Sequence, residues 1–566
     1  MYIPIYGYSV GSLQLQIDPP RQNALITPKI IHNRRTITAI LCANYPLLVA
    51  MPMASTTHGK SAVVGCIKRC ASAMPTANHG ELVSFALFSG KVIKSITKLP
   101  RTHPVSASRW LEGTSYSAKL KARMTDEYLS APHPCDNERF NDVGQFIKNE
   151  RFPEFKAPRL INAKKNPYKF HFGPIVAEVE KIVYERPEFI KKIPVRLRPQ
   201  YIMEKVAGPG RRYFTSDFTS FEANFSAFIM RNCENALIRH VFSDHPLYPK
   251  VDWLCRSIEG RQVCKSKLGY TMEVDATRMS GEMSTSLSNG FSNLMFMQYV
   301  FSSLGVTDLR IVVEGDDAIM SIPAGSPTPT VEHFAALGLK VKLQEHASIT
   351  TASFCGIVFA PEDMLNVTDP VSAIVEMNIL SDKCTNMRAS KKMSFLKSKA
   401  MSAKYQYNGC PLVDAYASWI LRETRRYDTR YAAARCSDWW TVQKNIHMDT
   451  DPTSWKERTL TPLPTRLLVA DLYSIPVETQ LAIEAYFDSS GPLNPWFLPS
   501  FHALCPPAWG RAWDMQTSTC DDVTSSSDLA DLPLPVGPCL TKHLGAPPRT
   551  LRRLFNPEMN GWTDVP

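Results

Sequence analysis

The sequence lacks a long uninterrupted hydrophobic run. Its most apolar early stretch, residues 39–54, is interrupted by Asn44, Pro46 and Pro52. A helix that crosses a bilayer needs about 20 consecutive apolar residues, so this stretch is too short and too broken to span one. Residues 1–10 hold no charged side chain, unlike the basic start of a secretory signal. We therefore expect neither a spanning helix nor a signal peptide in the N-terminal region.

The sequence also lacks a cysteine framework, a zinc-finger pattern, a repeat and a nucleotide-binding motif of the helicase type. The 14 cysteines form no dense framework, which favours reduced thiols over a disulfide scaffold. Cys66 and Cys70 are four residues apart, but no second pair follows at a zinc-finger distance. No repeat of fixed period occurs, and the phosphate-binding pattern G-x4-G-K-[ST] is absent. These absences argue against a zinc finger, a repeat protein and a helicase-type ATPase.

What the chain does have is a substantial core and an uneven distribution of charge. Of its 566 residues, 44% are hydrophobic, which excludes global disorder and suits a large multi-lobed protein. The formal net charge of +11 hides alternating blocks. Net charges are +8 for residues 1–145, +9 for 146–215, −8 for 216–380, +8 for 381–435 and −6 for 436–566. Basic flanks around an acidic centre suit a protein that grips a phosphate backbone and binds cations between the grips, although ordinary surface variation gives similar patterns.

The predicted elements indicate an α+β protein. Residues 1–60 look irregular, and a Ser-, Asp- and Pro-rich tail at 514–538 looks disordered. Apolar spacing predicts helices within 61–99, 110–128, 173–184, 221–242, 284–304, 331–337 and 393–426, and strands at 213–218, 309–313, 318–322, 339–343 and 354–359. The order across 213–360 resembles a ferredoxin-like split βαβ arrangement, with helices on one face of an antiparallel sheet.

Carboxylates follow or separate the predicted strands. Asp217 ends one strand, and Glu314-Gly315-Asp316-Asp317 joins two others through a tight turn. Such a turn projects its carboxylates from the sheet edge, where an acid from a neighbouring strand could complete a cage for two hard divalent cations. An ordinary hairpin turn has the same composition, and Gly-Asp-Asp alone is a weak signal.

A second polar pattern lies at 280–289. Gly281 permits a bend before a helix, on which Thr285 and Asn289 share one face and Asn293 extends the stripe. The stripe could meet the hydroxyls of a ribose, or it could be a solvated helix face. Leu287, Phe291 and Leu294 supply the opposite, core-facing side.

Asp-x4-Glu, Ser-Gly-x3-Thr-x3-Asn and Gly-Asp-Asp, in this order, resemble the palm of the RNA-dependent RNA polymerases of positive-strand RNA viruses, in particular the tombus-like and noda-like replicases. The basic segment 146–164 resembles the fingers motif of that family. The resemblance covers about residues 61–430 and leaves the first 60 and the last 130 residues unmatched.

The resemblance implies a role for each matching residue. Asp217, Asp316 and Asp317 would hold two Mg²⁺ ions, which Mn²⁺ could replace, and Lys340 or Lys342 would be the general acid, with Lys340 favoured as nearer the turn at Gly338. The residues implied to bind nucleotide and template are Lys148, Lys156, Arg159, Lys164, Glu222, Ser280, Gly281, Thr285 and Asn289, and those implied to bind RNA are Lys391, Lys392, Lys397 and Lys399. For the basic residues, a solvated loop is the alternative.

Three further expectations concern single residues and segments. The family most often has Asp where this chain has Glu222, whose carboxylate reaches one methylene further, which bears on 2′-hydroxyl recognition. Residues 354–359 resemble a hairpin that grips the primer, with Cys355 a small packing residue. Among the basic residues after 390, Tyr405, Tyr407, Trp419 and Tyr427 could stack on bases or pack in a core.

The predicted architecture is a right-hand polymerase with a ferredoxin-like, RRM-like palm sheet. Its regions are an N-terminal extension (1–60), an N-terminal and fingers region (61–212), palm (213–230), a fingers insertion (231–275), palm (276–365), thumb (366–510) and a C-terminal tail (511–566). It would copy a viral RNA genome from nucleoside triphosphates, with template and nascent RNA, other replicase proteins and host membranes as partners, in the host cytoplasm or a membrane-associated replication complex. A reverse transcriptase and a non-catalytic RNA-binding viral protein are the alternatives.

Overall fold

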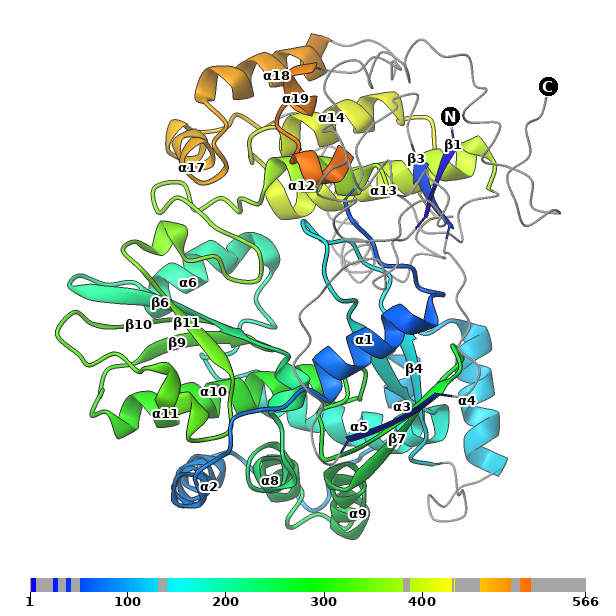
Figure 1. The fold of residues 1–566 in the computed structure, drawn as a ribbon, viewed down its shortest axis with the longest axis vertical. Helices are drawn as coiled ribbons and strands as arrows, with labels where there is room; N and C mark the ends of the chain where they lie inside the picture. The colour runs from blue at the N-terminus through cyan, green and yellow to red at the C-terminus, as the bar shows by residue number, and fades with distance from the viewer. Residues whose placement is uncertain are drawn as a thin grey trace.

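The computed structural model describes residues 51–130, 140–379, 387–429, 432, 459–489 and 499–510, together with the backbone of three short N-terminal strands. Two sheets lie side by side, with helices below them and a separate group of C-terminal helices above them in the view of Figure 1. The α+β class and the antiparallel strand pairing expected from the sequence are confirmed. The predicted tail at 514–538 lies outside the described residues.

The central sheet carries the predicted acidic turn. Its strands lie in the order β11-β6-β10-β9, and each neighbouring pair is antiparallel. Between β6 and β9 the chain first forms an insertion that includes part of the second sheet and then α10, and α11 separates β10 from β11. Apart from that insertion, the elements of this sheet follow a β-α-β-β-α-β order. The bounds are β6 Arg211–Phe218, α10 Thr285–Ser303, β9 Arg310–Glu314, β10 Asp317–Pro323, α11 Val331–Ala335 and β11 Val341–His346.

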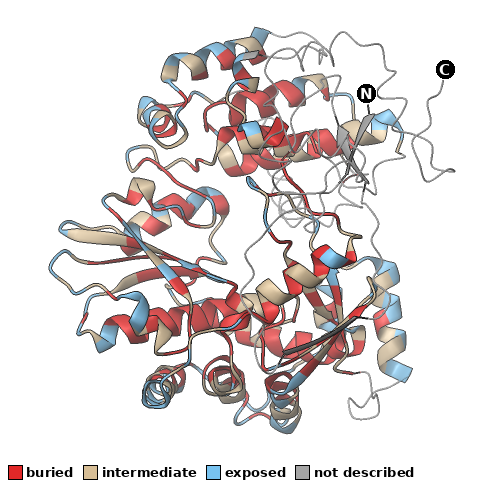
Figure 2. Ribbon diagram, viewed as in Figure 1, coloured by how far each residue is buried: buried red, intermediate tan, exposed pale blue. Residues whose placement is uncertain are grey.

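Most residues of helix α10 are buried in the hydrophobic core. Leu287, Phe291 and Leu294 are fully buried, and they belong to the same hydrophobic cluster as Phe214 and Phe218 of β6. Figure 2 shows this helix as a largely buried rod beside the sheet. Each such side chain contributes about 1.5–3 kcal/mol by leaving water. The packing therefore fixes where the N-terminal end of α10 meets the strand ends.

The second sheet joins segments that are far apart in sequence. Its order is β2-β8-β7-β4-β5, and only the β4–β7 pair is parallel. Cys66 and Cys70 of helix α1 pack on it against Val143, Leu160 and Met272. The bounds are α1 Gly59–Cys70, β4 Val143–Ile147, β5 Leu160–Lys164, β7 Arg261–Ser266 and β8 Tyr270–Asp275. Residues 61–212 and 231–275 therefore share one sheet.

The expectation that residues 1–60 are irregular is wrong for three segments. Strand β1 (Tyr2–Tyr6) pairs with β3 (Ile37–Leu41), and β2 (Ala24–Pro28) extends the second sheet beside β8. Pairing with β8 depends on a strand about 245 residues away along the chain, which no local pattern reveals.

The remaining helices of the first half cover the two sheets, and α2, α8 and α9 lie together at the lower edge of Figure 1. The predicted helix over 221–242 is interrupted, because Ser226 accepts a hydrogen bond from the Ile229 amide and starts a new helix, and Cys233 (φ −115°, ψ −98°) leaves the helical region. The bounds are α2 His79–Lys94, α3 Ala107–Glu112, α4 Ala118–Ser130, α5 Asn166–Val183, α6 Arg198–Val206, α7 Ala227–Asn232, α8 Glu234–Val241 and α9 Tyr248–Glu259.

The C-terminal helices have their own core, in which Trp419 and Phe487 stack. The predicted helical segment 393–426 forms two helices, because Gly409 (φ +78°) and Leu412 (φ +61°) turn the chain between them. Arg151 reaches these helices through Glu376 (2.9 Å), and Trp509 donates to the carbonyl of Pro153 (2.9 Å). The bounds are α12 Pro370–Met377, α13 Ala389–Tyr407, α14 Val413–Glu423, α17 Leu463–Tyr473, α18 Val477–Ser489 and α19 Pro499–His502.

Residues 354–359 do not form the predicted strand. Phe354 and Ile357 exchange backbone hydrogen bonds across a two-residue turn, Cys355-Gly356, in which both residues have positive φ (55° and 73°). Two positive φ values are typical of a type I′ turn. Within the described part of the chain, no helix is both long and apolar enough to cross a membrane.

Candidate functional site

Three aspartates lie at one end of the central sheet. Gly315 and Asp316 form the two-residue connection between β9 and β10, and Gly315 has φ +61°, as the first central residue of a type II′ turn requires. The register that pairs Ala318 with Ser216 places Asp217 beside Asp317. All three aspartates are exposed at this edge, so they are available to a ligand.

The carboxylates perturb one another. Loss of water, and then the charges of Asp316, Asp217 and Glu314, raise the pKa of Asp317 to about 6, although the residue as a whole is exposed. A hard divalent cation would relieve this concentration of negative charge, so the donor chemistry fits Mg²⁺ or Mn²⁺. As placed, however, no group of three or more His, Cys, Asp or Glu side chains in the described residues is close enough to hold an ion. Ion binding would therefore have to draw the aspartates inward.

Glu314 differs from the three aspartates because it is ion-paired with two cations. Its carboxylate lies 2.6 Å from the guanidinium of Arg198, which is 4% exposed, and 3.3 Å from the ammonium of Lys191. These two cations tie the base of the acidic turn to the start of α6 and to the segment before it. Glu314 therefore anchors the turn and leaves the aspartates to face outward.

The loop before α10 is held tightly. Ser280 donates a hydrogen bond to Glu222, and its carbonyl accepts from the Asn162 amide at 2.6 Å. The Thr285 hydroxyl accepts from the Gly281 amide (3.3 Å) and lies 2.9 Å from the carbonyl of Glu282, to which it donates. Thr285 therefore closes the loop at the start of the helix, and its hydroxyl is engaged within the loop.

The polar stripe of α10 faces the acidic turn. Asn289 is 8% exposed and Asn293 is fully buried, so a solvated helix face is wrong for these residues. The Asn293 amide donates to the carbonyl of Gly315 at 3.3 Å. Among the described residues, the buried Oδ1 of Asn289 and Oε2 of Glu222 have no hydrogen-bond partner. Unpaired buried acceptors need an explanation, and a polar ligand that they contact is one.

Two of the four predicted nucleotide-binding cations lie near this edge. Arg159 pairs with Glu150, which is also 3.0 Å from Lys148. The hydrogen bonds that Arg159 donates to Glu150 raise the pKa of Arg159, and the charges of Asp316 and Glu222 add to the effect. Lys148 lies close to Arg159, because both cations pair with Glu150. The role of both in phosphate binding stays a prediction.

The other two cations differ. Lys156 is exposed, with its ammonium 4.6 Å from the ring centre of Phe152. Lys164, in contrast, is only 2% exposed, and its ammonium donates to Gln262 and to the carbonyl of Asn141. This burial contradicts the prediction that Lys164 lines a nucleotide path, because its donors are used to join β5 to β7 and to residue 141.

The two candidate general acids occupy different positions. Lys342 is exposed in β11 directly across from Asp217, so the two side chains share a face of the sheet. Lys340 precedes the strand, and its backbone amide donates to Asn224 (2.6 Å). The choice between them stays open, and the register adds a reason to consider Lys342.

The basic helix α13 uses part of its charge internally. Lys397 donates to the carbonyls of Arg425 and Tyr427, and Lys399 donates to those of Glu376 and Ile379. Lys391 and Lys392 lie in the first turn of the helix. Tyr405 and Trp419 are buried, so of the two expectations for these aromatics, core packing is the one that holds. RNA binding by the four lysines stays a prediction.

Sequence reasoning missed Cys355. The type I′ turn brings its thiol close enough to Asp317 to lower the pKa of that carboxyl group. A left-handed backbone is unfavourable for a residue other than Gly, Asn or Asp. The Cys-Gly pair between apolar residues could have signalled this turn, but not its contact with β10.

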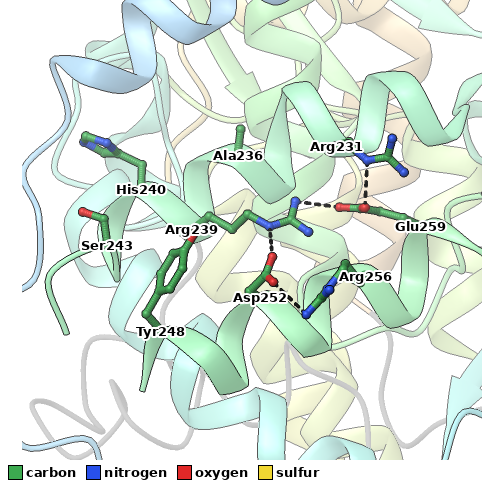
Figure 3. Close-up of a pocket in the computed structure, with 9 residues that line it drawn as sticks. All are labelled: Arg231, Ala236, Arg239, His240, Ser243, Tyr248, Asp252, Arg256 and Glu259. Carbon is green, nitrogen blue, oxygen red and sulfur yellow. Dashed lines mark hydrogen bonds and ion pairs between the residues drawn. The ribbon is translucent and has the colours of Figure 1, made fainter. Parts of the chain in front are cut away.

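A cavity lies elsewhere in the described part of the chain. About 570 Å³ in volume, it is lined by residues of α7, α8 and α9 (Figure 3). Its arginines are engaged: Arg239 bonds Asp252 and Glu259 at 2.7 Å each, and Arg231 and Arg256 pair with the same two acids. Because each of these arginines is already ion-paired, the acidic edge of the central sheet remains the stronger candidate site.

Comparison with known proteins agrees with the geometry. Residues 240–491 match a family described as viral RNA dependent RNA polymerase. The resemblance to viral RNA-dependent RNA polymerases is confirmed. The RNA-directed RNA polymerase of Pariacoto virus is 22% identical over 255 residues, which cover 43% of this chain and 26% of that protein. The polymerase of Melon necrotic spot virus is 22% identical over 363 residues, which cover 59% of this chain and 42% of that protein.

The matched region covers less than half of either relative's length. Within the family match lie the Ser280 loop, α10, the acidic turn and the C-terminal helices up to residue 491. Asp217 and the basic segment 146–164 precede it. The structure brings Asp217 beside the matched turn, so the site joins residues from inside and outside the matched region.

Proposed function

We propose that this chain is an RNA-dependent RNA polymerase that copies a viral RNA genome. It would catalyse template-directed attack of an RNA 3′-hydroxyl on the α-phosphate of a nucleoside triphosphate, with release of pyrophosphate. The observation that carries the proposal is the placement of Asp217, Asp316 and Asp317 at one end of the central sheet, next to helix α10, which carries the buried, unpaired acceptor of Asn289. The family match and the names of the two relatives support it.

Each part of the chain has a role in this proposal. The central sheet with α10 and α11 would be a ferredoxin-like palm (213–230 and 276–365), the second sheet the fingers (61–212 and 231–275), and the C-terminal helices the thumb (366–510). Residues 1–60 would be an N-terminal extension, and residues 511–566 would be a C-terminal tail. Arg151 and Trp509 would join fingers to thumb around the bound RNA.

The chemistry follows from the placement of the side chains. Asp217, Asp316 and Asp317 would hold two divalent ions, which would supply charge neutralisation for the hydroxyl and the leaving pyrophosphate. Arg159 and Lys148 would receive the triphosphate, because a guanidinium contacts phosphate oxygens in a bidentate manner. Glu222, Ser280 and Asn289 would contact the ribose, and Lys340 or Lys342 would donate a proton to pyrophosphate.

The partners would be template and nascent RNA, nucleoside triphosphates and, in a replication complex in the host cytoplasm, other replicase proteins and membranes. A reverse transcriptase would share the carboxylates, but the Ser-Gly-x3-Thr-x3-Asn motif and Glu314 argue against it. A non-catalytic RNA-binding protein would have no use for the aspartates.

Primer extension separates these readings. The full chain is incubated with an RNA template, a primer and Mg²⁺ or Mn²⁺, with either rNTPs or dNTPs. We expect extension with rNTPs and none after chelation with EDTA. Preferred use of dNTPs would favour a reverse transcriptase, and RNA binding without extension under either metal would favour the non-catalytic protein.

The Cys355 thiol should matter through Asp317. Cys355→Ala removes the thiol that lowers the pKa of that carboxyl group, and we expect the Mg²⁺ concentration for half-maximal extension to rise by about three- to tenfold, the scale of one hydrogen bond. Cys355→Ser retains a donor and should stay close to the unsubstituted protein. Equal metal requirements for the two variants would contradict this role.

A further inference from the structure

A buried ionic cluster lies beneath the Ser280 loop. Arg278, Glu234 and Glu282 have side chains that are at most 1% exposed. The Arg278 guanidinium pairs with Glu234 and lies 3.1 Å from Glu282. The second oxygen of Glu234 accepts from Ser292 of α10 at 2.9 Å, and the Phe225 ring centre lies 4.9 Å from Arg278. The cluster therefore joins α8, the loop and α10.

Burying these charges is expensive. Each ion loses its hydration, and a buried pair often stabilises a fold no better than well-packed apolar residues would. The cluster also carries two acids for one arginine, with Lys164 as the next cation that acts on Glu282. Stability alone is a weak reason for such an arrangement, whereas ion pairs and hydrogen bonds of fixed geometry can specify one conformation.

The cluster specifies the conformation of the Ser280 loop. Arg278 and Glu282 bracket Ser280 and Gly281, so their ion pair closes the loop at its base. The Arg278 amide also donates to the carbonyl of Glu222 at 3.2 Å, and the Ser280 hydroxyl donates to the Glu222 carboxylate. The cluster thus sets the relative positions of Ser280 and Glu222 without reaching the sheet edge itself.

We propose that Arg278, Glu234 and Glu282 are positioning residues that hold the Ser280 loop against Glu222 and thereby set how strongly the site selects ribose over deoxyribose. This inference rests on the proposed polymerase function. Recognition of a 2′-hydroxyl depends on hydrogen-bonding groups held in place, and a shift of about 1 Å can cost about a hundredfold in rate.

The test compares two glutamates in similar surroundings. Glu234→Gln keeps the shape of the side chain but removes the charge that fixes Arg278. The control is Glu259→Gln, because Glu259 is also buried on a helix of the same region and also pairs with arginines, Arg231 and Arg239, but none of its partners belongs to the loop (Figure 3).

For each variant, kcat and KM are measured for rNTP and dNTP incorporation, together with the melting temperature. We expect Glu234→Gln to lower the ratio of rNTP to dNTP efficiency by about tenfold, chiefly through the KM for rNTP, the scale of a difference of about 1.4 kcal/mol. Glu259→Gln should leave the ratio unchanged even if its melting temperature falls as far. An equal ratio in the two variants would overturn the proposal.

Two further measurements keep the outcomes separate. If Glu234→Gln does not fold, Ser292→Ala removes one hydrogen bond to Glu234 while all charges remain, and it should lower the ratio by a smaller factor; no change would overturn the proposal. Hydrogen exchange of the 279–285 amides needs no activity. If the unsubstituted protein makes no RNA, the proposed function fails. Hydrogen exchange still tests whether the cluster holds the loop: the loop amides should exchange faster in Glu234→Gln than in Glu259→Gln.

Discussion

Asp316→Asn is expected to reduce RNA synthesis by about a thousandfold or more, a loss of about 4 kcal/mol in transition-state stabilisation. Asp316 is at the tip of the β9–β10 turn and is exposed, so its carboxylate has no visible part in packing. In the proposed reaction it would hold a metal ion, and an amide oxygen is a much poorer ligand for a hard cation.

The folded state should not suffer from this substitution. The charge of Asp316 helps to raise the pKa of Asp317, so its removal relieves repulsion at the turn. We expect a melting temperature equal to or slightly above that of the unsubstituted protein, and retained RNA binding. Asp244→Asn is the matched control, because Asp244 is an exposed acid that pairs only with Lys98 and Ser243 at the surface in the described residues. Persistent extension by Asp316→Asn would contradict the proposed function.

The acidic site could be predicted because its signals are local. A tight turn joins the two strands on either side of Gly315-Asp316. The observed bounds of these strands lie within about two residues of the predicted bounds. The start of α10 and the shared face of Asn289 and Asn293 follow from helical periodicity. Predicting that Asp217 lies beside Asp317 also required the strand order of the central sheet, which the family resemblance implied.

Features that depend on distant partners were not predictable. Lys164 looks like its basic neighbours in sequence, but Gln262, almost 100 residues later, gives its ammonium a buried acceptor. Cys355 looks like a packing residue until its turn is placed against β10. Glu234 looks like an ordinary acid at the start of an amphipathic helix, and only the fold brings Arg278 to it.

Gly281→Ala should have the second-largest effect on activity. Gly281 has φ +121°, which L-residues rarely adopt, and an added Cβ would lie 3.1 Å from both the Asn162 carbonyl oxygen and Cγ2 of Ile161. The strain is worth about 1–3 kcal/mol. We expect a lower melting temperature and a loss of about a hundredfold in extension, because displacement of the loop would move Ser280 away from Glu222.

The control for this substitution is Gly260→Ala. Gly260 follows α9 with φ −102°, and an added Cβ would meet nothing within 4 Å, so alanine should be accepted with little change in stability or activity. The comparison also separates folding from function. The Asn162 amide and the Ser280 carbonyl connect β5 to the loop, so a shift at Gly281 should disturb the proposed ribose contacts even at temperatures where the chain stays folded. Full activity of Gly281→Ala well below its melting temperature would show that the loop geometry does not limit catalysis.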